Sequence, residues 1–380
     1  MELLYKLPIC VLNSRISFTF SPSFSSVMKV ILFCLYASFY ITSSKGTMNL
    51  PKNVSVQAIL AFGDSILDTG NNNYIQTWVK ANFPPYGRDF MGRKPTGRFS
   101  NGKIVADVFA KELGVKEYLP AYLDPSIQDK DLQTGVSFAS AGSGYDPLTT
   151  KITSSIPLPV QLDMFKQYIG KLVRNNGKEA AKNIISNSVY FVSASTNDFI
   201  ANYFTFPTRR SQYDIRAYND MLVKRAVGFV QDLHKLGARK IVVLGALPIG
   251  CLPIDRTVAG GLRRMCVDKY NKAAQLFNSM LIEKLQLLAS SLPQSKVAYG
   301  DIYNPLLRII ENPQRYGLEV TDRGCCGTGI IETAFACNKF SPTTCSDPSK
   351  YLFWDSVHPS ENGYSIYVDQ VLPDLVKSLF

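Results

Sequence analysis

Hydrophobic residues along this 380-residue chain are gathered in short continuous runs, separated by longer stretches in which apolar and polar positions alternate with a helical period. Five of the short runs are predicted to be strands because they are rich in apolar and β-branched residues: 56–62, 135–139, 188–194, 240–246 and 296–302. Apolar and polar residues do not alternate strictly within them, which is typical of strands buried on both faces of a parallel sheet.

The stretches between these runs predict helices. Apolar residues recur at helical spacing in residues 264–291 and again in residues 364–379. Strands that alternate with helices predict an α/β fold, here a three-layer α/β/α sandwich around a mostly parallel five-stranded sheet. No linker interrupts residues 50–380, so we expect a single domain there.

Residues 1–44 are predicted to be a signal peptide that is removed from the mature protein. An apolar stretch at 30–41 follows Lys29 and is followed by the small residues Ser43 and Ser44. This stretch is short for a membrane span, and a single anchor helix is the alternative interpretation. Met28 is an alternative start, which would make residues 1–27 an N-terminal extension.

The cysteines agree with export to an oxidising compartment. Two of the eight precede residue 45, and the other six are Cys251, Cys266, Cys325, Cys326, Cys337 and Cys345. An even number in an exported chain predicts disulfides. We expect a local bond between Cys251 and Cys266, with the other four cysteines pairing among themselves but not Cys325 with Cys326. A zinc site is the alternative, but the usual ligand spacing and a nearby histidine are missing.

Composition is that of a globular protein, with 46% hydrophobic and 19% charged residues. The net charge is +11; residues 1–44 carry Lys6, Arg15 and Lys29 against Glu2, so the remainder carries about 11 − 2 = +9. The basic residues form no stripe interleaved with aromatic residues, so we do not expect a nucleic-acid partner. An acidic extracellular matrix or another anionic surface is the expected partner. Asn53 lies in a glycosylation sequon.

Ser65 follows the first predicted strand and is a candidate nucleophile. The chain contains only two histidines, His234 and His358. Pro359 biases His358 away from helical geometry, and Asp355, three residues earlier, can accept a hydrogen bond from its imidazole. His234 is a poorer candidate for the base because it lies near the end of a predicted helix that Gly237 terminates. A turn serine and an exposed Asp–His loop are the alternatives.

Two further turns follow predicted strands and could supply hydrogen-bond donors. Gly142 follows the second strand, and Asn197 follows the third. The N–H groups of Ser65 and Gly142 and the amide of Asn197 would together form a three-donor oxyanion hole. Gly144 is the alternative glycine, and ordinary turns are the alternative interpretation of both segments.

Seven motifs occur along the chain in a fixed order: Phe-Gly-Asp-Ser (62–65), Pro-Thr-Gly-Arg-Phe-Ser-Asn-Gly (95–102), Ser-Gly-Tyr-Asp-Pro (143–147), Thr-Asn-Asp (196–198), Leu-Pro-Ile-Gly-Cys (247–251), Cys-Cys-Gly-Thr-Gly (325–329), and Trp-Asp with His-Pro (354–355 and 358–359). Together they resemble the plant form of the GDSL esterase/lipase family, within the SGNH hydrolase superfamily, and are similar to plant extracellular lipases. The resemblance runs from about residue 56 to 378.

The resemblance implies roles for individual residues. Ser65 would be the nucleophile, His358 the base and Asp355 its orienting partner, with Ser65, Gly142 and Asn197 as oxyanion donors. It implies a flavodoxin-like fold of the SGNH hydrolases, no metal and no organic cofactor. Three positions depart from the usual pattern: Ile66 replaces leucine, Ser137 replaces a common asparagine, and Ser195 replaces glycine. If that glycine has a positive φ, Ser195 would strain the turn.

The predicted function is that of a secreted carboxylic ester hydrolase of the cell wall or apoplast, acting through an acyl-serine intermediate. An acyltransferase with the same three residues is one alternative. A catalytically weak lipid- or wall-binding protein on the same scaffold is the other, supported by Ser195. The motifs do not specify the ester: acyl lipids, cutin-like polyesters, acetylated polysaccharides and phenolic esters all fit them.

Overall fold

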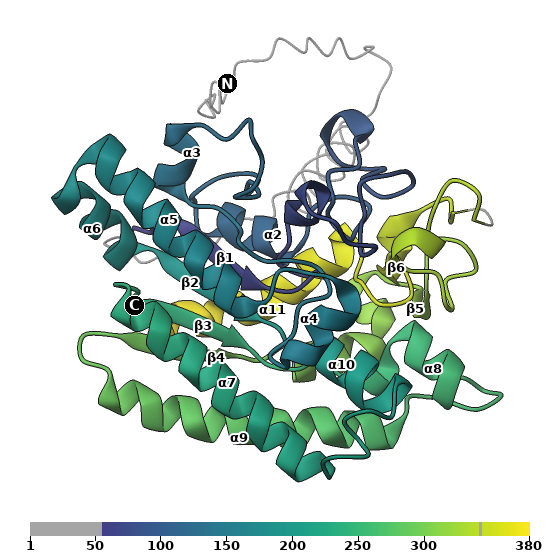
Figure 1. Cartoon of the computed structure of the whole chain (residues 1–380). Coiled ribbons are helices and arrows are strands. Elements are labelled where there is room, and N and C mark those ends of the chain that lie inside the picture. The colour runs from purple at the N-terminus through teal and green to yellow at the C-terminus, as the bar shows by residue number, and fades with distance from the viewer. Residues whose placement is uncertain (1–54, 342–343) are drawn as a thin grey trace, which may run out of the picture. The chain divides into compact units, whose positions relative to one another are not determined.

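A computed structural model describes residues 55–341 and 344–380 of the chain (Figure 1). Its central sheet contains four parallel strands in the order β1-β2-β3-β4: β1 (Ile59–Gly63), β2 (Val189–Ser193), β3 (Lys240–Leu244) and β4 (Lys296–Gly300). The predicted signal peptide at 1–44 and the sequon at Asn53 lie outside the described residues.

Burial along the strands explains the continuous apolar runs. Every residue of β1 and β2 is buried, and so is all of β3 except its first residue. The residues of β4 are less buried: this strand ends the sheet, whereas β1 at the other end is flanked by the segment that contains Ser137. The α/β class with a parallel sheet is therefore confirmed.

The predicted fifth strand at 135–139 is the one correction to the sheet. This segment lies beside β1, but it forms only an isolated bridge between Ser137 and Ala61. The N–H of Phe138 donates to the carbonyl of Ala61 at 2.7 Å, and the N–H of Ser140 to that of Gly63 at 2.9 Å. Ser137 also bridges to Ala121. The segment is an irregular edge rather than a full strand.

Helices cover both faces of the sheet (Figure 1). On one face lie α5 (Leu158–Asn176), α7 (Ile215–Lys235) and α9 (Asp268–Ser291), and on the other lie α2 (Val105–Glu112) and α11 (Glu361–Leu379). The predicted helices at 264–291 and 364–379 correspond to α9 and α11. The shorter helices are α3 (Asp129–Thr134), α4 (Pro147–Thr153), α6 (Lys178–Asn187), α8 (Pro253–Ala259) and α10 (Tyr303–Glu311).

Three disulfides join the six cysteines of the described region. Cys251 bonds to Cys266, Cys325 to Cys345 and Cys326 to Cys337. The local pair and the pairing among the other four agree with the sequence-based prediction. The last two bonds flank a second, two-stranded parallel sheet of β5 (Val320–Gly324) and β6 (Tyr351–Phe353). Within the described ranges, no helix is both long and apolar enough to cross a membrane.

Candidate active site

Ser65 lies in a tight turn directly after β1, at the carboxyl edge of the sheet. Gly63 makes this turn possible: its φ is +128°, and a Cβ there would lie 1.8 Å from the carbonyl oxygen of Ser193. The buried side chain of Gln161 holds Gly63 from α5, since it accepts its N–H at 2.8 Å and donates to its carbonyl at 2.9 Å. The nucleophile candidate therefore follows a backbone segment fixed on two sides.

The structure brings Ser65, His358 and Asp355 into one hydrogen-bonded chain. His358 Nε2 lies 2.8 Å from Ser65 Oγ, and His358 Nδ1 lies 2.8 Å from Asp355 Oδ2. All three residues are buried, with 7%, 5% and 0% of their surfaces exposed in the order serine, histidine, aspartate. This geometry suits a serine whose proton passes to an imidazole held by a carboxylate.

The loop between β6 and α11 determines where His358 lies. The backbone carbonyl of His358 accepts the N–H of Trp354 at 2.8 Å, and Pro359 forms a bridge to Phe353 of β6. Phe99, from the Pro-Thr-Gly-Arg-Phe-Ser-Asn-Gly motif, packs against the imidazole with ring centroids 4.7 Å apart. Ser360 then caps α11 by accepting the N–H of Gly363 at 3.0 Å. The imidazole is thus held between a capped helix and an aromatic ring.

Asp355 is fully buried, yet its surroundings favour the ionised carboxylate. Burial raises its pKa, but the charge of His358 and hydrogen bonds from His358 and Tyr86 outweigh burial and lower the pKa below its ordinary value. Tyr86 donates its hydroxyl at 2.7 Å and Thr333 donates at 3.1 Å, both to Oδ2. An ionised Asp355 is the form that orients an imidazole and stabilises its charged state.

Gly142 lies in the turn that follows the irregular edge segment. Its φ is +85°, which a side chain rarely adopts, and a Cβ there would lie 2.7 Å from Ser155 Oγ. Within the described part of the chain, neither the N–H of Gly142 nor that of Ser65 donates a hydrogen bond, so both are free to meet a ligand. At Gly144, by contrast, a Cβ would lie 2.1 Å from Asp198 Oδ1. Residue 144 is therefore a glycine because Asp198 leaves no room for a side chain there.

Asn197 follows β2 and lies beside the same turn. Its side-chain Nδ2 donates to the carbonyl of Ser143 at 2.9 Å, which leaves its second N–H for another acceptor, and the side chain is only half-buried. Ser195 does not adopt a positive φ, so the strain anticipated for it is absent. Its buried hydroxyl has no hydrogen-bond partner among the described residues.

A polar segment after Ser65 links the turn that contains Ser65 to the turn that contains Gly142. The sequence analysis did not predict this structural role. Asp68 accepts the N–H of Ala141 at 2.9 Å and that of Asn71 at 2.7 Å. Asn71 donates to the carbonyls of Ser137 and Ala139, at 2.9 and 2.8 Å. Burial raises the pKa of Asp68 to about 6, partly offset by these N–H donors. The polar composition of residues 68–73, which contain one Asp and three Asn, was the sequence feature that could have predicted this role.

Asp198 joins the turn at 142–146 to the segment that carries Asn197. It accepts the N–H groups of Tyr145 and Asp146, at 2.8 and 3.1 Å, and the hydroxyl of Thr149. Burial raises its pKa well above the ordinary value. The Thr-Asn-Asp motif therefore contains one residue with a free donor and one that holds it in place.

The other histidine lies away from this arrangement. His234 is in the last turn of α7, where its Nδ1 pairs with Ser295 Oγ at 2.9 Å. Burial and the nearby Arg239 lower its pKa. Among residues 55–341 and 344–380, no three His, Cys, Asp or Glu side chains are arranged to hold a metal ion.

Comparisons with known proteins show which family the chain belongs to. The profile of the family described as GDSL-like Lipase/Acylhydrolase matches residues 59–371. The GDSL esterase/lipase At5g42170 of Arabidopsis thaliana is 48% identical over 88% of this chain and 90% of its own length. GDSL esterase/lipase EXL3 of the same plant is 46% identical over 90% of this chain and 94% of its own.

Among solved structures, the extracellular lipase of Streptomyces rimosus is similar with a TM-score of 0.38 and 12% sequence identity, over 83% of this chain and 100% of its own. The family profile spans most of the chain, and the plant relatives are well over 40% identical across nearly their whole length. The chain therefore belongs to the GDSL-like lipase/acylhydrolase family.

Proposed function

We propose that this protein is a serine esterase that hydrolyses carboxylic esters through an acyl-serine intermediate. The observation that carries the proposal is the buried hydrogen-bonded chain from Ser65 Oγ through His358 to Asp355, with 2.8 Å at each step. Membership of a family whose relatives are named esterases or lipases supports the same reaction class.

In the proposed mechanism, His358 Nε2 takes the proton of Ser65 as its Oγ attacks the ester carbonyl carbon. The carbonyl oxygen becomes an oxyanion, which the N–H groups of Ser65 and Gly142 and the free N–H of Asn197 stabilise. The intermediate collapses when His358 returns the proton to the leaving alcohol. Water, deprotonated by His358, then attacks the acyl-serine, and His358 returns that proton to Ser65 Oγ as the acid is released.

Secretion is part of the proposal. Three disulfides within the described residues support folding in an oxidising compartment, because cytosolic thiols are kept reduced. The apolar stretch at 30–41 supplies the signal-peptide pattern. Ser195 does not adopt a positive φ, so it does not strain the turn, which weakens the argument for binding without catalysis.

The test is hydrolysis of p-nitrophenyl esters of increasing acyl length by the secreted protein. Ser65→Ala and His358→Ala should reduce turnover to background, while His234→Ala, which changes the other histidine, should leave it unchanged. Turnover that survives Ser65→Ala in folded protein would refute the proposal. Adding an alcohol acceptor and analysing the products would separate hydrolysis from acyl transfer.

A further inference from the structure

The carboxylate of Asp355 has more hydrogen-bond donors than its own loop supplies. Oδ1 accepts the N–H groups of Val357 and His358, at 2.8 and 2.7 Å. Oδ2 faces His358 Nδ1 at 2.8 Å, and it also accepts the hydroxyls of Tyr86 at 2.7 Å and Thr333 at 3.1 Å. The last two donors come from separate segments of the chain.

We propose that Tyr86 and Thr333 are positioning residues that together hold the Asp355 carboxylate in the orientation His358 requires. The proposal rests on the proposed function of Ser65, His358 and Asp355. Neither residue is part of a sequence pattern for catalysis, and both act through Asp355.

Tyr86 is buried and packed among aromatic rings, so its hydroxyl has a defined position. The side chain is only 1% exposed. Its ring makes edge-on contacts with Phe83, Phe99 and Trp354, at centroid distances of 5.9, 5.7 and 6.4 Å. Phe99 also packs against His358, so one aromatic cluster supports both the imidazole and the donor to its carboxylate.

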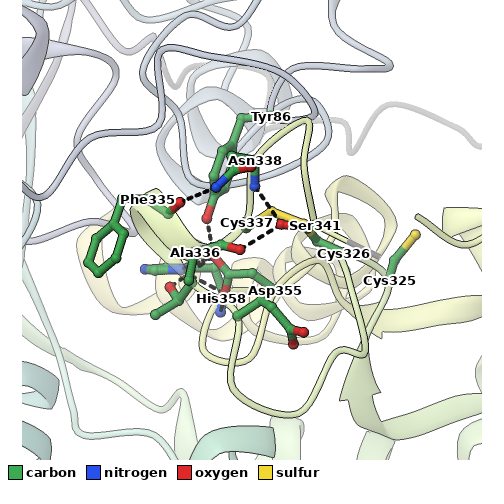
Figure 2. The surroundings of a disulfide bond; sticks show 12 residues. Tyr86, Cys325, Cys326, Phe335, Ala336, Cys337, Asn338, Ser341, Asp355 and His358 are labelled. Carbon is green, nitrogen blue, oxygen red and sulfur yellow. Dashed lines mark hydrogen bonds and ion pairs between the residues drawn. A yellow bond between two sulfur atoms is a disulfide. The ribbon is translucent and has the colours of Figure 1, made fainter. Parts of the chain in front are cut away.

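Thr333 lies in the loop that the Cys326–Cys337 disulfide closes. The residue before it, Glu332, accepts the N–H of Ser356 at 2.9 Å through its carbonyl. Thr333 is followed by a short 3-10 turn, Ala334–Ala336. Figure 2 shows Tyr86 and this loop on the side of Asp355 where the disulfide lies. The covalent closure limits how far Thr333 can move from the carboxylate.

These contacts matter because hydrogen bonds to a carboxylate are strong and directional. When His358 takes the proton from Ser65, its new charge is stabilised only if Asp355 points at Nδ1. Without the two hydroxyls, Oδ1 keeps its backbone donors and Nδ1 stays near both oxygens, at 3.0 Å from Oδ1 and 2.8 Å from Oδ2, but Oδ2 loses the two donors that fix its direction. The effect of losing them should therefore fall on the chemical step.

The experiment compares Tyr86→Phe, Thr333→Val and the double variant with the wild type, using a p-nitrophenyl ester. From the strength of hydrogen bonds to charged groups, each single change should lower kcat about ten-fold, with little change in KM. Thr333→Ser, which keeps a hydroxyl, should restore kcat. Tyr367→Phe is the matched control, because it removes a buried hydroxyl with no partner among the described residues.

The rate of labelling by a fluorophosphonate probe gives a second readout that does not depend on the ester chosen. The double variant should label more slowly than wild type at equal thermal stability. Wild-type kcat and labelling rate in the folded double variant would overturn the positioning proposal. Ester turnover that persists in Ser65→Ala would instead refute the proposed function, and with it the positioning roles of Tyr86 and Thr333.

Discussion

Replacing Arg98 with methionine tests how a buried ion pair holds the motif at 95–102 in place. Arg98 Nε and Nη2 donate to the two oxygens of Asp107 on α2, at 2.7 and 2.8 Å. The guanidinium also donates to the carbonyls of Leu119 and Thr69, at 2.8 and 3.1 Å. The two charged side chains are 6% and 0% exposed.

The expected cost follows from what remains after the change. Among the described residues, Arg98→Met leaves buried Asp107 with only the N–H groups of Ile104 and Leu119 as donors, at 3.1 and 2.9 Å. Removing one partner of a buried ion pair typically costs roughly 3–5 kcal/mol, because the remaining charge loses its compensation. We therefore expect the free energy of unfolding to fall by about that amount.

The assay is equilibrium unfolding in urea with the disulfides intact. Lys377→Met is the control, because Lys377 and Asp374 form an ion pair whose side chains are 77% and 83% exposed, and its loss should change stability little. Combining Arg98→Met with Asp107→Leu should recover part of the loss, since no buried charge remains. A loss below about 1 kcal/mol for Arg98→Met would refute the reasoning.

Three further outcomes are expected. Asn197→Ala should lower kcat on a p-nitrophenyl ester by about 10²–10³, as for other oxyanion donors; an unchanged kcat would remove Asn197 from that role. Gly142→Ala should lower the free energy of unfolding by roughly 1–3 kcal/mol, because φ is +85° and the new Cβ would lie 2.7 Å from Ser155 Oγ; urea unfolding at wild-type stability would contradict this. Burial raises the pKa of Asp255 to about 8, so wild-type stability should decrease as pH rises, because the unfolded chain ionises this carboxyl first. Asp255→Asn should therefore gain stability over wild type from pH 5 to pH 8, and an equal difference at both pH values would contradict the assignment.

Local patterns determined the elements and the places where chemistry could occur. Continuous apolar runs are enough to identify β1, β2 and β3, because strands buried on both faces contain few polar residues. The three-residue spacing of Asp355 and His358 is also local, and the turn it encodes brings the carboxylate to Nδ1. The resemblance of the motifs to a known family then assigned a role to each of these residues.

Tertiary structure decided which distant residues meet and which segments complete the sheet. Ser65 and His358 are 293 positions apart, and Tyr86 and Asp355 are 269 apart, so no local pattern couples them. The segment at 135–139 has the composition of a strand, but its pairing is irregular. Strand pairing depends on the backbone segments that lie alongside, and here Ser137 bridges to Ala61 on one side and to Ala121 on the other. The periodicity of the sequence indicates which side chains will be buried. The hydrogen-bond partners of buried polar groups are determined only when the whole chain packs.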